Sequence, residues 1–209
     1  MKMNRVQVKI CGVTSIDDAK KCADLGVDMI GLNFCRESPR YVEPKIARKI
    51  IEAVVPRVCA VGVFVERTIN EVRKTAAVAD LRCLQLHGNI RPETCQELAH
   101  EFRVIRVLRT DNRFQPQDAQ FFLGCDVLID AHHPELHGGT GQICDWSAAR
   151  AALPFTRFLI LSGGLNPNNV GKAIATVAPH AVDVCSGVES VPGLKDHRAL
   201  EKFIAAVRD

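Results

Sequence analysis

Residues 158–167 read Phe-Leu-Ile-Leu-Ser-Gly-Gly-Leu-Asn-Pro, an apolar run that ends in a glycine-rich turn. The apolar part predicts a short buried strand, and Asn166-Pro167 is typical of a helix start, where proline suits the first turn. Glycines after a strand let backbone N–H groups approach an anion, and a helix N-terminus directed at the same place favours negative charge. The stretch therefore predicts a strand–turn–helix unit that can bind phosphate.

A second turn of the same kind follows the next strand. The strand expected over Val182–Cys185 continues into Ser186-Gly187. An isolated glycine pair most often makes only a tight turn, so Gly163-Gly164 alone would decide little. Two such turns on the last two strands favour a phosphate site of the kind that parallel barrels often carry. We therefore predict phosphate binding by Gly163, Gly164, Ser186 and Gly187.

Similar units extend outward from this region over the whole chain. Short apolar runs recur at even spacing, and each is followed by a segment with helical apolar spacing. Ser15 with Asp17 and Thr68 predict the starts of the first and third helices, and the fifth and sixth helices are expected near Asp118–Leu123 and Trp146–Leu153. Strict alternation of strands and helices predicts a parallel sheet with right-handed crossovers, either a closed barrel or an open doubly wound sheet. The predicted strands are Val6–Cys11, Met29–Phe34, Cys59–Phe64, Cys83–Leu86, Val104–Leu108, Val127–Asp130, Phe158–Leu161 and Val182–Cys185.

Closure of the sheet into a barrel explains more of the sequence than an open sheet does. The strands are apolar almost throughout, as expected when both faces are covered. Barrel closure also places the first strand beside the eighth, so that Cys11 lies near the two glycine turns. We therefore predict an α/β fold, a compact single (β/α)8 TIM barrel with eight parallel strands, as one domain over residues 1–209.

The composition limits the classes of function. Apolar residues make up 47% of the chain and charged residues 24%, and the small formal charge of +3 argues against nucleic-acid binding. No apolar stretch is long enough for a membrane span, and the first residues do not resemble a signal peptide. The nine cysteines are odd in number and form no Cys-x-x-Cys motif. We expect a reduced, cytoplasmic protein, a monomer or homodimer, with no metal and no cofactor.

Polar side chains mark the carboxyl ends of the predicted strands. These ends meet on one face of a parallel barrel, where groups from different strands can act together on one ligand. The residues predicted to line this pocket are Cys11, Arg40, Gln85, His87, Asp130 and Asp183.

Several of these residues stand in longer segments that together match one family. The segments are Lys9-Ile10-Cys11-Gly12, Ser38-Pro39-Arg40-Tyr41, Gln85-Leu86-His87-Gly88, Leu128-Ile129-Asp130, Gly138-Gly139-Thr140-Gly141, Asp145-Trp146, Leu161-Ser162-Gly163-Gly164-Leu165-Asn166-Pro167 and Val182-Asp183-Val184-Cys185-Ser186-Gly187-Val188-Glu189. With them the chain resembles the phosphoribosylanthranilate isomerases, barrel enzymes of tryptophan biosynthesis. The resemblance extends from Lys9 to the last helix.

The resemblance implies an Amadori rearrangement, in which N-(5-phosphoribosyl)anthranilate becomes 1-(2-carboxyphenylamino)-1-deoxyribulose 5-phosphate. By the family's roles, Asp130 is the general acid that protonates the ring oxygen, and the Cys11 thiolate removes the proton from C2 of the sugar. Arg40 would bind the anthranilate carboxylate, which suits a planar guanidinium. We expect Cys11 either to have a lowered pKa or to be deprotonated on binding, and Asp130 to be held protonated.

Other interpretations of these residues stay open. Cys11 could be a packing residue, as a cysteine in a strand most often is, and Asp130 could cap the turn that follows it. Arg36 could bind the carboxylate in place of Arg40. Asp183 could orient either the phosphate loop or a substrate hydroxyl.

Three histidines after the sixth predicted strand could suggest a metal. His132 and His133 are adjacent and His137 is distant, which is not the usual spacing of metal ligands. A mobile loop with Gly138-Gly139 as its hinge is the preferred interpretation.

Two rival functions also remain. Another phosphate-binding barrel, such as a sugar-phosphate epimerase or an indole-glycerol-phosphate synthase, would need metal ligands or a Lys/Glu acid–base set at the strand ends, and neither is evident. A catalytically silent protein that binds a phosphorylated ligand would not need Cys11 together with Asp130.

Overall fold

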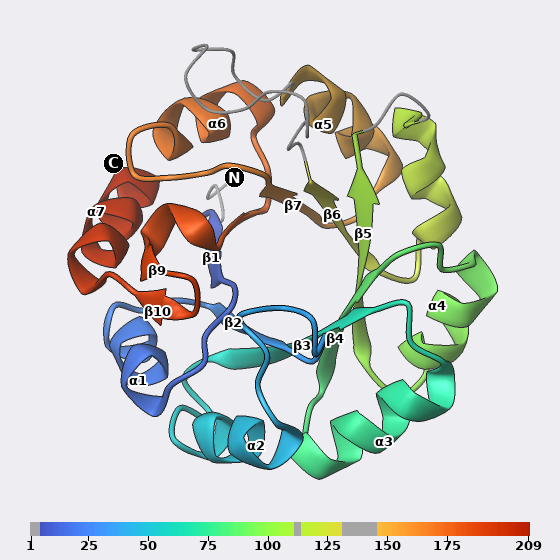
Figure 1. The fold of residues 1–209 in the computed structure, drawn as a ribbon. Helices are drawn as coiled ribbons and strands as arrows, with labels where there is room; N and C mark the ends of the chain where they lie inside the picture. The colour runs from blue at the N-terminus through green and yellow to red at the C-terminus, as the bar shows by residue number, and fades with distance from the viewer. Residues whose placement is uncertain (1–4, 111–113, 131–145) are drawn as a thin grey trace.

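A computed structural model describes residues 5–110, 114–130 and 146–209 of the chain. Parallel strands close into a barrel in which each strand pairs with the next along the chain and the last pairs with the first (Figure 1). The predicted α/β fold, a (β/α)8 TIM barrel, is confirmed; that residues 1–209 form one domain stays a prediction. The strands are β1 (Gln7–Ile10), β2 (Met29–Asn33), β3 (Cys59–Val65), β4 (Cys83–His87), β5 (Arg103–Arg109), β6 (Asp126–Asp130), β7 (Leu159–Ser162) and β8 (Ala181–Val184).

Helices surround the barrel and cover the outer face of the strands (Figure 1). The segment expected to be helical near residues 118–123 is a 3-10 helix, and the one expected over 146–153 ends earlier because Pro154 has no N–H to continue it. The helices within the described residues are α1 (Ile16–Asp24), α2 (Pro44–Glu52), α3 (Ile69–Ala79), α4 (Pro92–Ala99), α5 (Trp146–Ala152), α6 (Val170–Val177) and α7 (His197–Arg208), with 3-10 helices η1 (Pro116–Phe122), η2 (Leu153–Phe155) and η3 (Ser186–Val188).

Side-chain caps fix where two of the helices begin. Ser15 accepts a hydrogen bond from the backbone N–H of Asp18 at the start of α1. At the start of α3, Thr68 and Glu71 form a reciprocal capping box. The predicted starts of these two helices are confirmed.

The predicted helix start at Asn166 is wrong, because α6 begins at Val170. Asparagine side chains fold the intervening residues into a turn. Asn169 Oδ1 accepts from the backbone N–H of Asn166 at 2.8 Å, and Asn166 Oδ1 accepts from that of Asn168 at 2.9 Å. Local hydrogen bonds of this kind compete with those of a helix, so the helix begins further along the chain.

The barrel interior changes from apolar to polar along the strands. Successive strand residues point to opposite faces, so every second residue faces the barrel axis. Eight buried residues pack together inside the barrel: Met29, Val61, Cys83, Ile105, Val107, Leu128, Ile160 and Ala181. Two positions further along three of these strands, the residue that faces the axis is polar: Gln85 after Cys83, Asp130 after Leu128 and Asp183 after Ala181. The polar groups therefore gather at the carboxyl ends of the strands.

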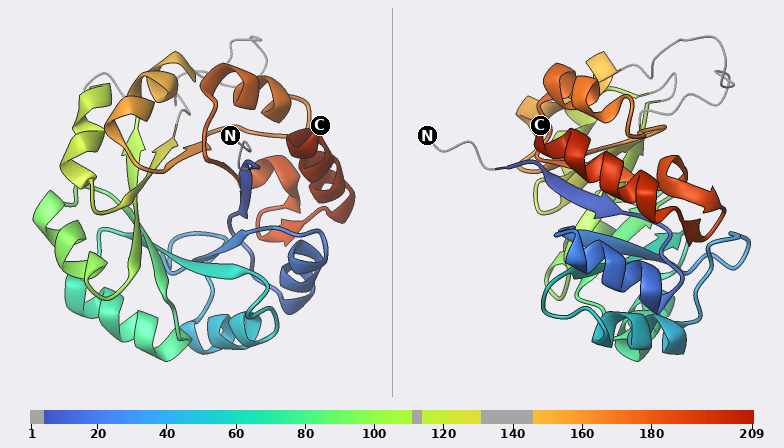
Figure 2. Two further views of the ribbon diagram at one scale, coloured as in Figure 1. Left: turned by 180° about the vertical axis from the view of Figure 1, so that it is seen from behind. Right: turned by 90° about the vertical axis from the view of Figure 1, so that its left-hand side faces the viewer.

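A hairpin that the sequence analysis did not predict lies at the same end. Strands β9 (Glu189–Val191) and β10 (Leu194–Lys195) pair antiparallel across a Pro192-Gly193 turn, in which Gly193 has φ +88°. The right-hand view of Figure 2 shows it at the end of the barrel toward which β1 points. No helix among the described residues is long and apolar enough to cross a membrane.

The capping box of α3 gives a stability prediction. We expect Thr68→Ala to lower the free energy of unfolding by about 1 kcal/mol, because an N-terminal N–H of the helix loses its acceptor. Lys74→Ala, at an exposed position of the same helix, should change it by less than about 0.5 kcal/mol. Urea unfolding followed by circular dichroism measures both, and equal effects of the two variants would contradict the assigned cap.

Candidate active site

The last two glycine turns border one cavity, together with the predicted acid. The cavity, which we call the β6–β8 cavity, has a volume of about 240 Å³. It is lined by Asp130, Ser162, Gly163, Gly164, Leu165, Asp183, Val184, Cys185 and Ser186. The predicted phosphate-binding residues Gly163, Gly164 and Ser186 are therefore brought to one place with Asp130 and Asp183.

Glycines allow the two turns to pack against each other. Gly163 and Gly164 have φ of +99° and +64°, a region that favours glycine. A Cβ on Gly187 would lie only 2.0 Å from the carbonyl oxygen of Leu165 in the other turn. Gly187 thus permits the contact between the turns, although it does not itself line the cavity.

A buried ion pair joins the first and last strands. Lys9 and Asp183 are register partners on β1 and β8, and Lys9 Nζ lies 2.9 Å from Asp183 Oδ1. The Lys9 side chain is fully buried, and Ser162 donates a hydrogen bond to the other Asp183 oxygen at 3.2 Å. Burial opposes the charge of Lys9, but the Asp183 carboxylate outweighs it and raises the pKa of Lys9. Lys9 therefore keeps its positive charge.

Cys11 lies next to this lysine. A Cβ on Gly31 of β2 would lie 2.8 Å from Cys11 Sγ and 3.2 Å from Lys9 Nζ, so the absent side chain leaves room for both groups. A hydrogen bond from the Cys185 thiol lowers the pKa of Cys11; burial opposes this, and the Lys9 ammonium lowers the pKa further. The pKa of Cys185 is raised in turn. Cys11 therefore has the environment of a thiolate.

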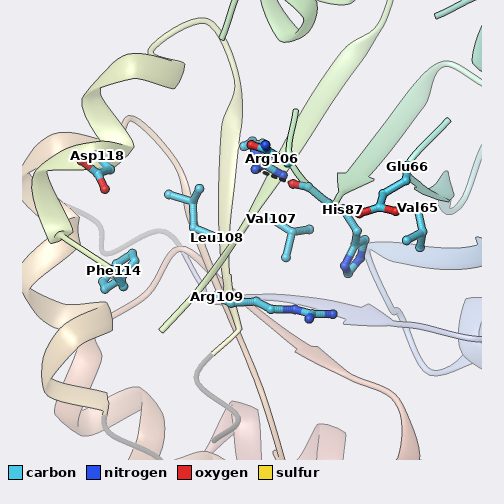
Figure 3. A pocket seen from close by; sticks show the side chains of 11 residues that line it. Val65, Glu66, His87, Arg106, Val107, Leu108, Arg109, Phe114 and Asp118 are labelled. Atoms are coloured by element: carbon cyan, nitrogen blue, oxygen red, sulfur yellow. Dashed lines mark hydrogen bonds between the residues drawn. The ribbon is translucent and has the colours of Figure 1, made fainter. Parts of the chain in front are cut away.

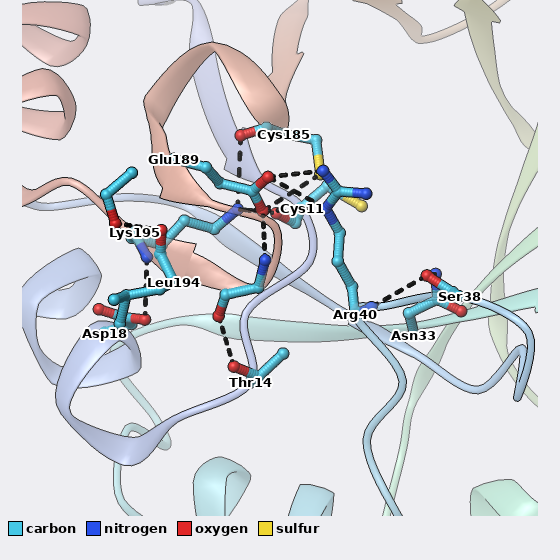
Figure 4. Close-up of polar contacts among 12 residues, drawn as sticks. Cys11, Thr14, Asp18, Asn33, Ser38, Arg40, Cys185, Glu189, Leu194 and Lys195 are labelled. Atoms are coloured by element: carbon cyan, nitrogen blue, oxygen red, sulfur yellow. Dashed lines mark hydrogen bonds and ion pairs between the residues drawn. The ribbon is translucent and has the colours of Figure 1, made fainter.

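A second charged cluster fixes the loop after β2 and the hairpin (Figure 4). Lys195, whose side chain is fully buried, donates to the carbonyl oxygen of Cys11 at 2.6 Å and to Glu189 at 2.8 Å. Arg40 donates through Nε and Nη2 to the same carboxylate, at distances down to 2.6 Å. Burial raises the pKa of Glu189, but hydrogen bonds from Arg40 and Lys195 outweigh it and lower that pKa to about 2.

Arg40 therefore reaches the site but already has a carboxylate partner. A Cβ on Gly12 would lie 2.6 Å from Arg40 Cδ and 3.0 Å from Cys185 Sγ, which places this arginine beside the two cysteines. The predicted contact between Arg40 and a substrate carboxylate stays a prediction. Arg36, the alternative, lies over the ring of Tyr41 and lines a groove with residues of α3, away from this cluster.

His87 and Gln85 lie on β4, across the barrel from β8. Burial, together with the charges of Lys9 and Arg109, lowers the pKa of His87 to about 4, so its ring is neutral near pH 7. The Nε2 atoms of Gln85 and His87 are 2.8 Å apart, and the amide donates to the neutral ring. His87 lines a larger cavity of about 560 Å³, the β3–β5 cavity (Figure 3). Gln85 is buried behind it.

Several residues of the site escaped the sequence analysis. Lys9, Cys185, Glu189 and Lys195 set the charge around Cys11, yet no role was predicted for any of them. Lys9 carried a usable signal, because a charged residue inside an apolar strand must find a buried partner.

The described residues hold no group of three His, Cys, Asp or Glu side chains that could bind a metal. The three histidines considered for such a site, His132, His133 and His137, lie outside the described residues, as does Gly138-Gly139.

A closed parallel barrel whose polar groups gather at the carboxyl ends of its strands defines the class of (β/α)8-barrel enzymes. A family model described as N-(5'phosphoribosyl)anthranilate (PRA) isomerase matches residues 8–206. The chain belongs to this family.

Individual relatives agree over nearly the whole chain. The N-(5'-phosphoribosyl)anthranilate isomerase of Geobacter sulfurreducens is 43% identical over 95% of this chain and 97% of its own. The crystal structure of the Thermotoga maritima enzyme superposes with a TM-score of 0.90 at 39% identity, covering 97% of this chain and 98% of that one. A further structure, in complex with reduced 1-(o-carboxyphenylamino)-1-deoxyribulose 5-phosphate, has a TM-score of 0.87 at 37% identity over the same shares.

The pairing of Cys11 with Cys185 gives a prediction. Removing the thiol in Cys185→Ala takes away a hydrogen bond that stabilises the Cys11 thiolate, so the pKa of Cys11 should rise and its alkylation near pH 7 should slow several-fold. Iodoacetamide rates against pH, with the modified cysteine mapped by mass spectrometry, measure the shift. Cys22→Ala, which removes a buried thiol outside this pair, is the control. A Cys11 pKa unchanged in Cys185→Ala would contradict the assignment.

Proposed function

We propose that the protein converts N-(5-phosphoribosyl)anthranilate to 1-(2-carboxyphenylamino)-1-deoxyribulose 5-phosphate, the isomerase step of tryptophan biosynthesis. Membership of the family supports this reaction. The observation that carries it is the placement of two groups at one end of the barrel: Asp130 lines the cavity formed by the glycine turns, and Cys11 lies next to Lys9 on the strand beside β8.

The phosphate is proposed to bind between the last two turns. Backbone N–H groups near Gly163, Gly164 and Ser186 can donate to its oxygens, since glycine lets the backbone approach closely. Gly187 is proposed to act through its contact with the other turn. This end of the substrate does not react, so its binding energy serves to position the sugar between the acid and the base.

Ring opening is the proposed first step. Asp130 gives its proton to the furanose oxygen, the C1–O bond breaks, and the nitrogen lone pair forms a C1=N bond. The product of this step is a protonated Schiff base with an open sugar chain, and Asp130 is left as a carboxylate. A positioned acid of this kind contributes typically about 10²–10⁴ to the rate.

Proton removal from C2 is the proposed second step. The Cys11 thiolate takes this proton, the C–H electrons form a C1=C2 bond, and the iminium nitrogen becomes a neutral amine. The resulting enolamine gains a proton at C1 and loses one from its C2 hydroxyl, which gives the ketone. Lys9 is proposed to stabilise the thiolate, and Asp183 to hold Lys9 in place and to contact a sugar hydroxyl.

The rival functions have weaker support. An epimerase or a synthase would belong to a different family from the one that matches this chain. A silent binding protein has the same fold and family, so only turnover separates it from the enzyme. We propose a cytoplasmic location, no cofactor, a small phosphorylated molecule as ligand and no nucleic-acid partner; monomer or homodimer stays a prediction.

The activity prediction tests the acid and the base together. Anthranilate-type fluorescence should decay when the native protein meets freshly made phosphoribosylanthranilate. Cys11→Ser and Asp130→Asn should each lower kcat by at least about 10²-fold, because each removes one proton-transfer group.

Two matched controls should stay within about threefold of the native rate. Cys35→Ser changes a cysteine in the loop after β2, and Asp126→Asn changes the carboxylate at the opposite end of Asp130's own strand. A native protein that binds the substrate but leaves its fluorescence unchanged would favour the silent binding protein.

A further inference from the structure

Two cysteines meet where the first and last strands of the barrel pair. The register of β1 and β8 matches Ile10 with Val184, and the N–H of Cys11 continues the ladder by donating to the Val184 carbonyl oxygen at 2.8 Å. Cys11 and Cys185 are the next residues along these two strands, side by side. Register partners on parallel strands point to the same face of the sheet, so the two thiols lie on one face.

Several contacts hold these cysteines together. Lys195 Nζ donates to the carbonyl oxygen of Cys11 at 2.6 Å and to that of Cys185 at 3.4 Å. A Cβ on Gly12 would lie 3.0 Å from Cys185 Sγ, so the glycine next to Cys11 leaves room for this thiol. Figure 4 shows both cysteines beside Arg40. Paired strands are about 4.8 Å apart, within the range of about 4.4–6.8 Å between the Cα atoms of a disulfide. The backbone therefore allows a disulfide here.

The two thiols differ in protonation. The hydrogen bond from Cys185 lowers the pKa of Cys11 to about 7, against burial and together with the Lys9 ammonium. The same hydrogen bond raises the pKa of Cys185 well above its ordinary value, so this thiol keeps its proton. Peroxides oxidise thiolates, and a neighbouring thiol can then displace the oxygen from the oxidised sulfur. A thiolate and a thiol in contact are the two groups that this chemistry requires.

Small solutes can reach the pair. Cys11 and Cys185 are both partly exposed, and Cys185 lines the β6–β8 cavity of about 240 Å³. Hydrogen peroxide is only slightly larger than water, so it fits a cavity of this size. The ammonium groups of Lys9 and Lys195 act on Cys11, and positive charge at this place favours the hydroxide that leaves a peroxide.

Among the described residues, two other pairs of thiols are hydrogen-bonded, and both are less suited to oxidation. Cys59 of β3 lies two positions before Val61, the register partner of Cys83 on β4. This offset places the two Cα atoms roughly 8 Å apart, beyond the limit of about 7 Å for a disulfide without backbone movement. Cys95 and Cys125 are buried, which keeps peroxide away from them.

We propose that Cys11 and Cys185 form a modification site for hydrogen peroxide, in which Cys11 is oxidised and Cys185 converts the product into a reversible disulfide. The Cys11 thiolate attacks one peroxide oxygen, the O–O bond breaks and hydroxide leaves; the sulfur is oxidised to a sulfenic acid and the peroxide is reduced. The Cys185 sulfur then attacks that of Cys11, the S–O bond breaks, and the departing hydroxide takes the Cys185 proton to form water. Two thiols of a reductant, which become a disulfide themselves, restore both cysteines.

The disulfide removes the proposed general base, because its sulfur can no longer accept a proton. This consequence for activity rests on the proposed function, whereas the oxidation itself does not. A sulfenic acid without a neighbouring thiol oxidises further to sulfinic and sulfonic acids, which thiols do not reduce. Cys185 therefore makes the loss of Cys11 reversible.

The test compares the native protein with Cys185→Ser, which keeps a hydrogen-bond donor beside Cys11 but forms no disulfide. Both are treated with a molar excess of hydrogen peroxide, which catalase then removes. Trypsin places Cys11 and Cys185 in separate peptides with no other cysteine, so mass spectrometry without reduction identifies each product. The native protein should show the two peptides joined, with the loss of two hydrogen atoms. Cys185→Ser should show Cys11 with two or three added oxygen atoms. Cys59→Ser, the control, should form the same disulfide as the native protein.

Activity on phosphoribosylanthranilate is measured relative to each untreated protein. After peroxide, dithiothreitol should return most of the native activity and little of that of Cys185→Ser. Two results would overturn the inference: sulfinic or sulfonic acid at Cys11 of the native protein without a disulfide, or oxidation of Cys59 with Cys83 while Cys11 stays a thiol. A disulfide between Cys11 and Cys185 in a protein that never converts the substrate would contradict the proposed function and leave the modification site standing.

Discussion

The ion pair between Lys9 and Asp183 is the interaction on which the rest of the site depends. It joins β1 to β8 at the point where the barrel closes, with Lys9 Nζ 2.9 Å from Asp183 Oδ1. Removing two charges from water is costly, and a buried pair often adds little net stability. Its value here is better explained by position: it holds a positive charge beside Cys11, the proposed general base. The same ion pair therefore joins the first and last strands of the barrel and lies beside the proposed base.

The charged cluster around Glu189 likewise joins separate segments of the chain, at the rim of the barrel. The Glu189 carboxylate accepts hydrogen bonds from Arg40 in the loop after β2 and from Lys195 in the hairpin. Lys195 also donates to the carbonyl oxygen of Cys11. Three segments far apart in the chain are thus fixed around one carboxylate. Because the charges of Arg40, Lys195 and Glu189 are matched among themselves, they hold this part of the site in shape.

The sequence predicted the elements whose signals are local. Apolar runs located all eight strands to within a few residues, and the caps at Ser15 and Thr68 marked two helix starts. Because parallel strands present their carboxyl ends together, Asp130 and the glycine turns were expected at the same face, and they line one cavity.

What the sequence did not predict depends on contacts between distant residues. Arg40 and Glu189 are separated by 149 positions, and nothing in either segment indicates the pair. The start of α6 was misplaced because Asn166 and Asn169 bond within a turn. Arg109 lies just beyond the predicted strand Val104–Leu108, and only the barrel register pairs it with Asp130.

The central claim is that Asp130 opens the ring and Cys11 removes the proton from C2. The most direct test is the kinetic isotope effect on kcat/KM with deuterium at C2, measured in the native protein, Cys11→Ser and Asp130→Asn. In Cys11→Ser the proton removal becomes limiting, so the isotope effect should be larger than in the native protein. In Asp130→Asn the ring opening limits, so it should approach unity. The reverse pattern, with the large effect in Asp130→Asn, would contradict the assignment of base and acid.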